Sequence, residues 1–560
     1  MSDDAAHVVV ELAKRGKLVV GEPYFSPGVP LVIDRKGSGE ARSGDLAVVD
    51  QNRRRARLQR VLGRANDIEA VLEGLLVHTG ARTDFEPYDL PDPSLEGRVD
   101  LRDLTTFTID PGTAKDFDDA LSIREEPEGL RAWVHIADVS AFVPAGSPLD
   151  RGAAERSFTT YVPGRAAPML PPELADDRCS LRPYEDRVTV TVELPPTGTP
   201  SIYRSVIRSD ARLTYGQAER REAAPDIAEA LELTDRLSAA MRERRFARGA
   251  LRIETPEIAF EFDGHGRVGR AWKESEPTAH RLVEELMIAA NEAVAELLSS
   301  RRRAALYRVH ERPGPTAIEL LVAKLADLRV PTPPVPEHLS PAAAAGVAAA
   351  ASELVMEYVK RSHRGAEAFP ALVLRSLKQA RYHSENLGHS GLASRAYCHF
   401  TSPIRRYPDL VVHRALLREL GLSDDPGPAD LEALAEHTSA REREAAQIEY
   451  LADEICLAWL LEDELFERGW DAEWEGEVVG LIGAGLFVRF GEVFEGFLPS
   501  RRLGGDFFEP NALGTALAGR RGGGTYRLGD EIAVRVEKVE RAEGKVELAP
   551  ASNRRRRRRE

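Results

Sequence analysis

Four aspartates lie within ten residues of one another, in the segment 107–123 with the sequence FTIDPGTAKDFDDALSI. Carboxylates packed this tightly repel one another and raise each other's pKa, so the arrangement is reasonable only if hard cations neutralise them. Magnesium fits this chemistry best, and manganese is the alternative. The sequence therefore predicts a metal site formed by Asp110, Asp116, Asp118 and Asp119.

Short apolar, β-branched runs on both sides of the cluster predict two strands. Pro111 and Gly112 break the first strand, which puts Asp110 at its end and the other three aspartates in the loop that returns to the second. Neighbouring side chains diverge on an extended chain, so Asp118 and Asp119 could serve two ion positions.

An acidic segment of this kind is also compatible with other roles. Acidic clusters are most often solvated turns. An EF-hand is excluded because the glycine at the sixth loop position and the glutamate at the twelfth are both missing. A sugar-nucleotide transferase using Asp116-x-Asp118 stays open on this segment alone. No serine triad is visible, since the segment 388–391 (GHSG) fails the Gly-x-Ser-x-Gly spacing, and no His-Glu-x-x-His pattern occurs.

Composition sets wider limits. A length of 560 residues indicates three or four domains, and a hydrophobic content of 42% is ample for packed cores. The first thirty residues have no signal-type apolar region and no apolar run approaches twenty residues, so we expect a cytoplasmic protein without a membrane anchor. Three widely spaced cysteines predict buried thiols rather than disulfides or a zinc site.

The net charge of −15 argues on average against a polyanionic partner. Arginines nevertheless gather locally, and the clearest case is the C-terminal block, because like charges at a terminus cannot fold and suit a polyanion. The clusters are Arg53 to Arg60, Arg301 to Arg303, Arg405 with Arg406, and Arg554 to Arg559.

The chain reads as an α+β multidomain protein. Alternating segments up to residue 65 predict a small antiparallel barrel, possibly incomplete, and Asn66 or Asp67 would cap a helix that ends near His78. The helical face of 280–300 predicts a core helix. The expected domains are 1–65 (cold-shock-like barrel), 66–96 (helix and linker), 97–468 (large mixed α/β domain with a helical C-terminal part), 469–550 (five-stranded barrel of OB type) and 551–560 (basic tail).

The last barrel carries aromatic residues beside cations, the combination that single-stranded nucleic acid requires. Strand alternation must place some of these rings in the core, so we expect one or two exposed stacking residues. The residues concerned are Phe487, Phe490, Phe494 and Phe497 with Arg489, Arg501 and Arg502.

These motifs together resemble the RNase II / RNase R (RNB) family of exoribonucleases, over roughly residues 98 to 550. The C-terminal barrel is similar to the RNA-binding repeat of the S-one ribosomal-protein type that normally follows this catalytic domain. The segments that carry the resemblance are the acidic loop 109–123, then 135–139 (HIADV), 161–163 (YVP), 168–171 (PMLP), 179–181 (CSL), 211–215 (ARLTY) and 399–410 (HFTSPIRRYPDL).

The resemblance implies roles for individual residues. The four aspartates match the family's magnesium carboxylates, with Asp118 at the position treated as indispensable, and Arg405 falls on the arginine that contacts the scissile phosphate. Tyr215 and Tyr161 fall on aromatic positions near the terminal nucleotides. The proposed catalytic set is Asp118, Arg405 and Tyr215, and the proposed RNA contacts are Tyr161, Arg406, Phe487, Phe490 and Arg489.

The implied activity is hydrolytic 3′-to-5′ degradation of single-stranded RNA to nucleoside 5′-monophosphates by a monomer that acts on neither DNA nor membranes. Family members usually carry two cold-shock barrels, and the roughly ninety residues before the match accommodate one. The alternative is a catalytically silent RNA-binding regulator on the same fold. Because such proteins lose their carboxylates, the retained aspartates and Arg405 favour an enzyme.

Overall fold

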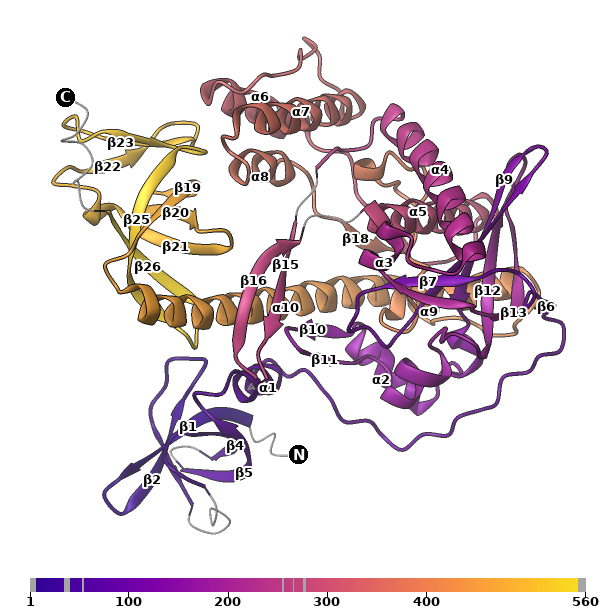
Figure 1. Ribbon diagram of the computed structural model, residues 1–560, viewed down its shortest axis with the longest axis horizontal. Helices are drawn as coiled ribbons and strands as arrows, with labels where there is room; N and C mark the ends of the chain where they lie inside the picture. Colours follow the sequence, from indigo (N-terminus) through magenta and orange to yellow (C-terminus); the bar gives the residue numbers. More distant parts are fainter. Residues whose placement is uncertain are drawn as a thin grey trace.

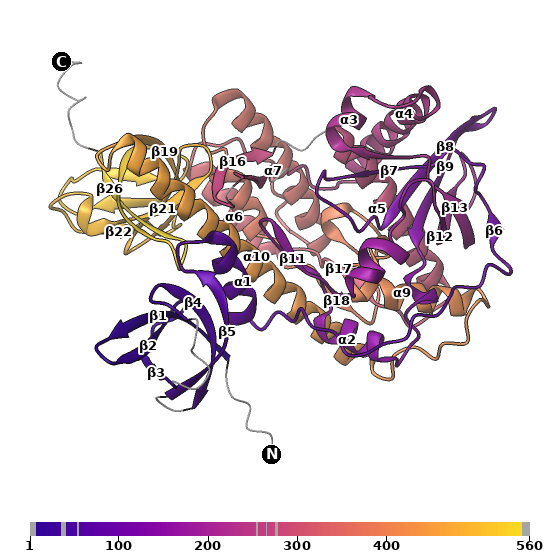
Figure 2. The same ribbon diagram turned by 60° about the horizontal axis from the view of Figure 1, so that its bottom comes forward.

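The computed structural model describes residues 7–34, 41–52, 55–253, 256–264, 266–274 and 278–551. An N-terminal barrel (indigo) and a C-terminal barrel (orange to yellow) lie at one end of the molecule, and a large mixed region lies at the other (Figure 1). The long helix α10 (Leu431–Arg468) runs from the mixed region to the C-terminal barrel, and the turned view shows the N-terminal barrel beside it (Figure 2).

The small N-terminal barrel predicted from the sequence is present, and it is closed rather than partial. Its strand order is β1-β2-β3-β5-β4, and the parallel pairing of the short β3 with β5 completes the closure. Arg53 and Arg54 lie outside the described residues, as does the arginine tail 554–559. The strands are β1 (His7–Arg15), β2 (Leu18–Pro23), β3 (Leu31–Ile33), β4 (Asp45–Asn52) and β5 (Arg55–Arg64).

Helix α1 (Ile68–His78) follows as expected. Asp67 is its N-cap, and the Asp67 carboxylate accepts the backbone N–H of Glu69 at 3.0 Å, which satisfies one of the free donors of the first turn. The connector that follows contains no helix or strand before β6 (Val99–Asp100).

A seven-stranded sheet forms the centre of the mixed region. Its order is β14-β7-β8-β9-β12-β13-β6, with parallel pairs only at the two edges, β14 with β7 and β13 with β6. The helix expected over 280–300 is α5 (Thr278–Ser300), and its face with Leu286 and Val294 is buried in the core that includes the sheet. The other strands are β7 (Phe107–Asp110), β8 (Asp119–Glu126), β9 (Gly129–Ala137), β12 (Asp186–Leu194), β13 (Ser201–Arg208) and β14 (Ala211–Thr214).

Three helices, α6 (Pro315–Asp327), α7 (Pro341–Ser362) and α8 (Ala368–Arg375), form a separate layer near the C-terminal barrel (Figure 1). By length and composition, α7 is the one helix among the described residues that could cross a membrane. Val347 and Val355 on α7 are buried against this layer, which is the packing of a core helix.

Helix α10 joins the parts of the molecule. Its first turns belong to the core of the mixed region, and its later residues Ile455, Trp459 and Leu461 belong to a second core that includes the C-terminal barrel and α1. The three cysteines are free and buried, as the sequence predicted.

The C-terminal barrel is closed, with the order β19-β20-β21-β26-β25. The predicted domain also contains a three-stranded sheet outside the barrel, formed by β22 (Phe508–Pro510), β23 (Ala516–Gly519) and β24 (Thr525–Arg527). The barrel strands are β19 (Glu473–Ile482), β20 (Gly485–Phe490), β21 (Phe494–Pro499), β25 (Glu531–Glu540) and β26 (Lys545–Pro550).

Candidate active site

The four aspartates lie where two neighbouring strands of the central sheet meet a loop. Asp110 is the last residue of β7 and Asp119 the first of β8, while Asp116 and Asp118 belong to the connecting loop. Ser180 fixes that loop, because its hydroxyl accepts the N–H of Phe117 at 3.0 Å and donates to the carbonyl of Lys115 at 2.6 Å.

Asp118 links this loop to a segment far along the chain. Its side chain is 3% exposed, and its Oδ1 accepts the backbone N–H of Ile404 at 2.8 Å. Its Oδ2 lies 3.3 Å from Nε of Arg405, whose side chain is 46% exposed. The structure therefore places the predicted arginine beside the predicted metal carboxylate, with part of the arginine side chain open to solvent.

Burial raises the pKa of three of the carboxylates, those of Asp110, Asp118 and Asp119. It raises the pKa of Asp110 to about 6 and that of Asp119 to about 7, and repulsion from neighbouring carboxylates adds to both shifts. Burial also raises the pKa of Asp118 well above its usual range, although Arg405 opposes the shift. A divalent cation bound at such a site would stabilise the ionised form of these carboxylates.

The residues fit such a cation in their chemistry. Asp110 Oδ2 and Asp118 Oδ2 are buried without a hydrogen-bond partner, so two carboxylate oxygens keep free lone pairs. Among the described residues, no three acidic, histidine or cysteine side chains are close enough to enclose an ion by themselves. Magnesium commonly binds through one or two carboxylates and completes its shell with water and substrate phosphate, which is the condition met here.

Tyr161 lies at the same site. Its hydroxyl donates to Asp116 Oδ2 at 2.7 Å, and its backbone N–H donates to Glu449 Oε1 of α10 at 2.8 Å. The side chain remains 40% exposed, and burial of the hydroxyl next to Asp116 raises the pKa of the phenol. Tyr161 can thus hold one carboxylate and still present part of its ring.

Tyr215 approaches the cluster from the edge of the sheet. It begins α3 (Tyr215–Arg220), directly after Thr214, which pairs with Asp110 between β14 and β7. Burial raises the pKa of Tyr215, with contributions from Asp119 and Asp110, and its ring meets His280 edge-on at 5.5 Å.

Arg406, expected to contact RNA, is engaged inside the protein. Its Nε and Nη2 donate to Asp409 at 2.9 and 2.8 Å, and Asp409 is completely buried. The pair lies at the start of α9 (Tyr407–Glu419).

The three predicted contacts on the C-terminal barrel lie on β20, which Figure 1 shows apart from β7, the strand that ends at Asp110. Phe487 is 37% exposed, and its ring is 5.2 Å from that of Phe497 on the next strand. Phe490 is 1% exposed and packs against Trp474 in the barrel core, so its assignment as an RNA contact is corrected: strand alternation turns it inward. Arg489 pairs with Glu495 at 2.8 Å.

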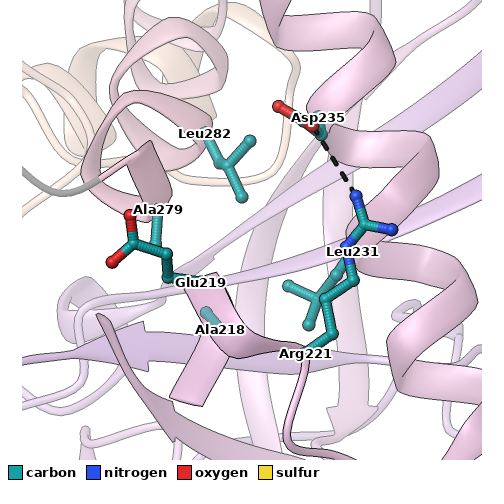
Figure 3. A pocket seen from close by; sticks show the side chains of 7 residues that line it. All are labelled: Ala218, Glu219, Arg221, Leu231, Asp235, Ala279 and Leu282. Atoms are coloured by element: carbon teal, nitrogen blue, oxygen red, sulfur yellow. Dashed lines mark ion pairs between the residues drawn. The ribbon is translucent and has the colours of Figure 1, made fainter. Parts of the chain in front are cut away.

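A hollow of about 160 Å³ between α3, α4 (Pro225–Ala247) and α5 is not part of this site. Figure 3 shows Arg221 and Asp235 forming an ion pair at its rim, at 3.8 Å, with Leu231 and Leu282 beside them. None of the four aspartates lines it.

Sequence reasoning did not identify Ile404, Asp409 or Glu449 as parts of the site. Asp409 lies three residues after Arg406, a spacing at which helical side chains can meet, so the sequence does indicate an ion pair between them. The Tyr161–Glu449 contact spans 288 residues and leaves no local trace in the sequence.

Comparison with known proteins identifies the class to which this fold and site belong. The RNB domain model matches residues 98–421, more than half of the chain, and the S1 RNA binding domain model matches residues 470–549. The chain belongs to the RNB family of 3′-to-5′ exoribonucleases.

Its relatives within that family are ribonucleases R. Ribonuclease R of Escherichia coli is 32% identical over 610 residues, which cover 98% of this chain and 73% of the relative. Ribonuclease R of Mycoplasma genitalium, solved in complex with ribose methylated single-stranded RNA, has a TM-score of 0.85 at 23% identity and covers 98% of this chain and 90% of its own. Yeast Ssd1, described as a pseudonuclease, has a TM-score of 0.66 at 19% identity and covers 92% and 68%.

Proposed function

We propose that this chain hydrolyses single-stranded RNA from the 3′ end and releases nucleoside 5′-monophosphates one at a time. The observation that carries the proposal is the meeting of the acidic loop 110–119 with Arg405 through the Asp118 contacts. An intact carboxylate cluster beside a half-exposed guanidinium is what phosphodiester hydrolysis requires: a place for cations and a fixed positive fork for the phosphate.

Asp110, Asp116, Asp118 and Asp119 would supply the carboxylates for divalent cations, one or two to an ion, and we take the cation to be magnesium with manganese as the alternative. When bound, divalent cations activate water as a nucleophile and stabilise the leaving oxygen in phosphodiester cleavage. The unpartnered, buried oxygens of Asp110 and Asp118 support this assignment.

The protein's own groups orient the substrate. The exposed part of the Arg405 guanidinium can bind the oxygens of the scissile phosphate, whose negative charge grows in the transition state. Tyr161 steadies Asp116 through its hydroxyl and offers its ring to a base, and Tyr215 approaches from the other side of the cluster near Asp110 and Asp119.

The C-terminal barrel would bind RNA upstream of the reacting end. Phe487 and its neighbour Phe497 present aromatic surface for stacking, which every base can use and which therefore suits an enzyme of broad sequence range. The single-stranded RNA bound by the Mycoplasma relative supports this substrate class. A monomeric state, a cytoplasmic location and a lack of activity on DNA stay predictions.

The second candidate is a regulator that binds RNA without cleaving it. Ssd1 demonstrates that this fold also occurs in a pseudonuclease, so fold alone does not separate the two functions. The retained aspartates and Arg405 favour the enzyme, because a binding protein has no need to gather four carboxylates beside one arginine.

A time course with 5′-labelled single-stranded RNA and magnesium tests the proposal, beside Asp118→Asn and an EDTA control. We expect a ladder that shortens from the 3′ end in the unmodified protein and no shortening in either control. Binding without degradation by the unmodified protein, in both magnesium and manganese, would instead support the regulator.

A further inference from the structure

The segment 399–406, which carries Arg405, contains only turns and an isolated bridge between Arg406 and Phe158, so most of its backbone needs partners outside a helix or sheet ladder. Two such partners come from the central sheet region. Asp118 accepts the N–H of Ile404, and the carbonyl of Arg405 accepts the N–H of Thr159 at 2.9 Å. Two further partners are Asn291 of α5, whose Oδ1 accepts the N–H of Phe400 at 2.8 Å, and Tyr382, whose hydroxyl lies 2.7 Å from His399 Nδ1. The helix that follows supplies the others.

Helix α9 holds the segment through two side chains. Asp409 and His413 are four residues apart and therefore lie on one face of α9. His413 Nε2 donates to the carbonyl of Phe400 at 2.8 Å, and its ring stacks on that of Phe400 with centroids 4.2 Å apart. Asp409 Oδ1 accepts the backbone N–H of Ser402 at 2.8 Å.

Arg406 completes this anchor. It donates to both oxygens of Asp409, and its backbone N–H donates to the carbonyl of Ser402 at 3.0 Å. The φ and ψ of Arg406 are −132° and 119°, an extended conformation in which successive side chains point in opposite directions. The two adjacent arginines thus diverge: Arg406 turns into the protein toward Asp409, and Arg405 turns toward Asp118.

We propose that Arg406 and Asp409 are positioning residues for catalysis: their ion pair fixes the segment 399–406 so that the Arg405 guanidinium lies beside Asp118. In this assignment Arg406 acts through Arg405 and makes no essential contact with RNA. The inference rests on the proposed function and adds the means by which the phosphate-binding arginine is held.

The ion-pair partners and the exposure of the two side chains support a positioning role for Arg406 and a phosphate-binding role for Arg405. The Arg406 side chain is 23% exposed and has a fully buried carboxylate as a two-point partner. The Arg405 side chain is 46% exposed, lies 3.3 Å from Asp118 and donates to the hydroxyl of Ser402 at 3.2 Å. Arg406→Lys keeps the positive charge but removes the two-point hydrogen bonding, because lysine lacks the planar guanidinium. The substitution should therefore loosen the orientation of the segment without changing its charge.

The test compares Arg406→Lys, Arg405→Ala and the double variant Arg405→Ala/Arg406→Lys. Arg441→Lys is the matched control, because Arg441 forms an exposed ion pair with Glu444 at the same three-residue spacing, at 2.6 Å. The measurements are kcat and KM on a single-stranded RNA, the Kd for the same RNA in EDTA, and hydrogen exchange of the backbone amides of Ser402, Ile404, Arg405 and Arg406.

For Arg406→Lys we expect kcat to fall roughly ten- to a hundredfold, the scale of a small misplacement of a reacting group, while the Kd for RNA changes less than about twofold. The double variant should be no slower than Arg405→Ala alone, because Arg406 has nothing left to position. The loop amides should exchange faster in Arg406→Lys than in the unmodified protein, and Arg441→Lys should match the unmodified protein in every measurement.

Three results would overturn the proposal. A weaker Kd with a shallower salt dependence would make Arg406 an RNA contact. Losses of kcat that multiply in the double variant would make the two arginines independent. A lowered melting temperature with unchanged kcat would make the pair merely structural.

Should Arg406→Lys fail to fold, Asp409→Asn can be tested in its place, because it keeps an acceptor for the Ser402 N–H. We expect Asp409→Asn also to lower kcat, by a smaller factor than that expected for Arg406→Lys. An unmodified protein that does not degrade RNA would contradict the proposed function, and hydrogen exchange would still report whether Arg406 fixes the loop.

Discussion

Asp118 accepts a hydrogen bond from the backbone N–H of Ile404 across a separation of 286 residues, at 2.8 Å. This bond joins the acidic loop to the segment that carries Arg405. The residue expected to hold a cation therefore also fixes the distance between the carboxylates and the guanidinium. Its two oxygens have different tasks, since Oδ1 binds the backbone and Oδ2 faces Arg405.

Asp118→Asn should separate these tasks. The amide oxygen can still accept the N–H of Ile404, so the fold should persist, but the negative charge is lost. We expect cleavage of single-stranded RNA to fall at least about a hundredfold, the scale of removing one electrostatic group from an active site, with RNA affinity retained. Asp92→Asn, in the exposed connector, is the matched control and should cleave normally. Equal activity of the two variants would contradict a role for Asp118.

The raised carboxylate pKa values predict how stability depends on pH. Asp110 and Asp119, with folded-state pKa values of about 6 and about 7, bind protons in the folded state at pH values where the unfolded chain has released them. Their contribution to the stability of the metal-free protein is therefore lost as pH rises from about 4 to about 7. Magnesium should offset that loss.

We accordingly expect magnesium to raise the melting temperature more at pH 8 than at pH 5, measured by thermal unfolding with EDTA as the reference. Below pH 6 the ion competes with protons for Asp110 and Asp119, so its stabilisation shrinks. The same comparison in Asp118→Asn should give a smaller shift at pH 8. A shift that is equal at both pH values would argue against these carboxylates as the ligands.

The sequence predicted those features of the fold that depend only on residues close together in the chain. The Asp67 cap, the strand break at Pro111 and the amphipathic face of α5 depend on neighbouring residues, and each was found where the pattern indicated. The closure of the N-terminal barrel depends on the parallel pairing of β3 with β5, and three-residue strands such as β3 leave little periodicity to recognise.

The candidate site could be predicted in its residue types and less well in its connections. Alternation could not tell which aromatic residues of β20 and β21 face the core, because both faces carry phenylalanine, and the structure resolves this by burying Phe490 and exposing Phe487. The role of Arg406 was also hidden. An arginine beside a phosphate-binding arginine resembles a second phosphate contact until its partner Asp409 is seen.

Tyr161→Phe should test the contact between the phenol and Asp116. The substitution removes a 2.7 Å hydrogen bond to a carboxylate and keeps the ring. Since a hydrogen bond to a charged group contributes about 1.5–3 kcal/mol, we expect kcat to fall roughly ten- to a hundredfold with little change in RNA affinity. Tyr184→Phe, at a tyrosine that is 75% exposed and lines none of these contacts, should leave kcat unchanged. A loss of affinity without a loss of kcat would assign Tyr161 to base stacking alone.

Phe487→Ala and Phe490→Ala should have opposite effects, although both residues lie on β20. Phe487 is exposed beside Phe497, so its removal should weaken binding of single-stranded RNA by about 1–3 kcal/mol, the value of one stacked base, and leave the melting temperature nearly unchanged. Phe490 packs against Trp474 and Phe494, so its removal should destabilise the C-terminal barrel by about 3–5 kcal/mol. Equilibrium binding in EDTA and thermal unfolding of the full chain separate the two effects. If Phe487→Ala binds RNA as tightly as the unmodified protein, the outer face of β20 is not the RNA-binding surface. Arg501 and Arg502, which follow β21, then become the better candidates.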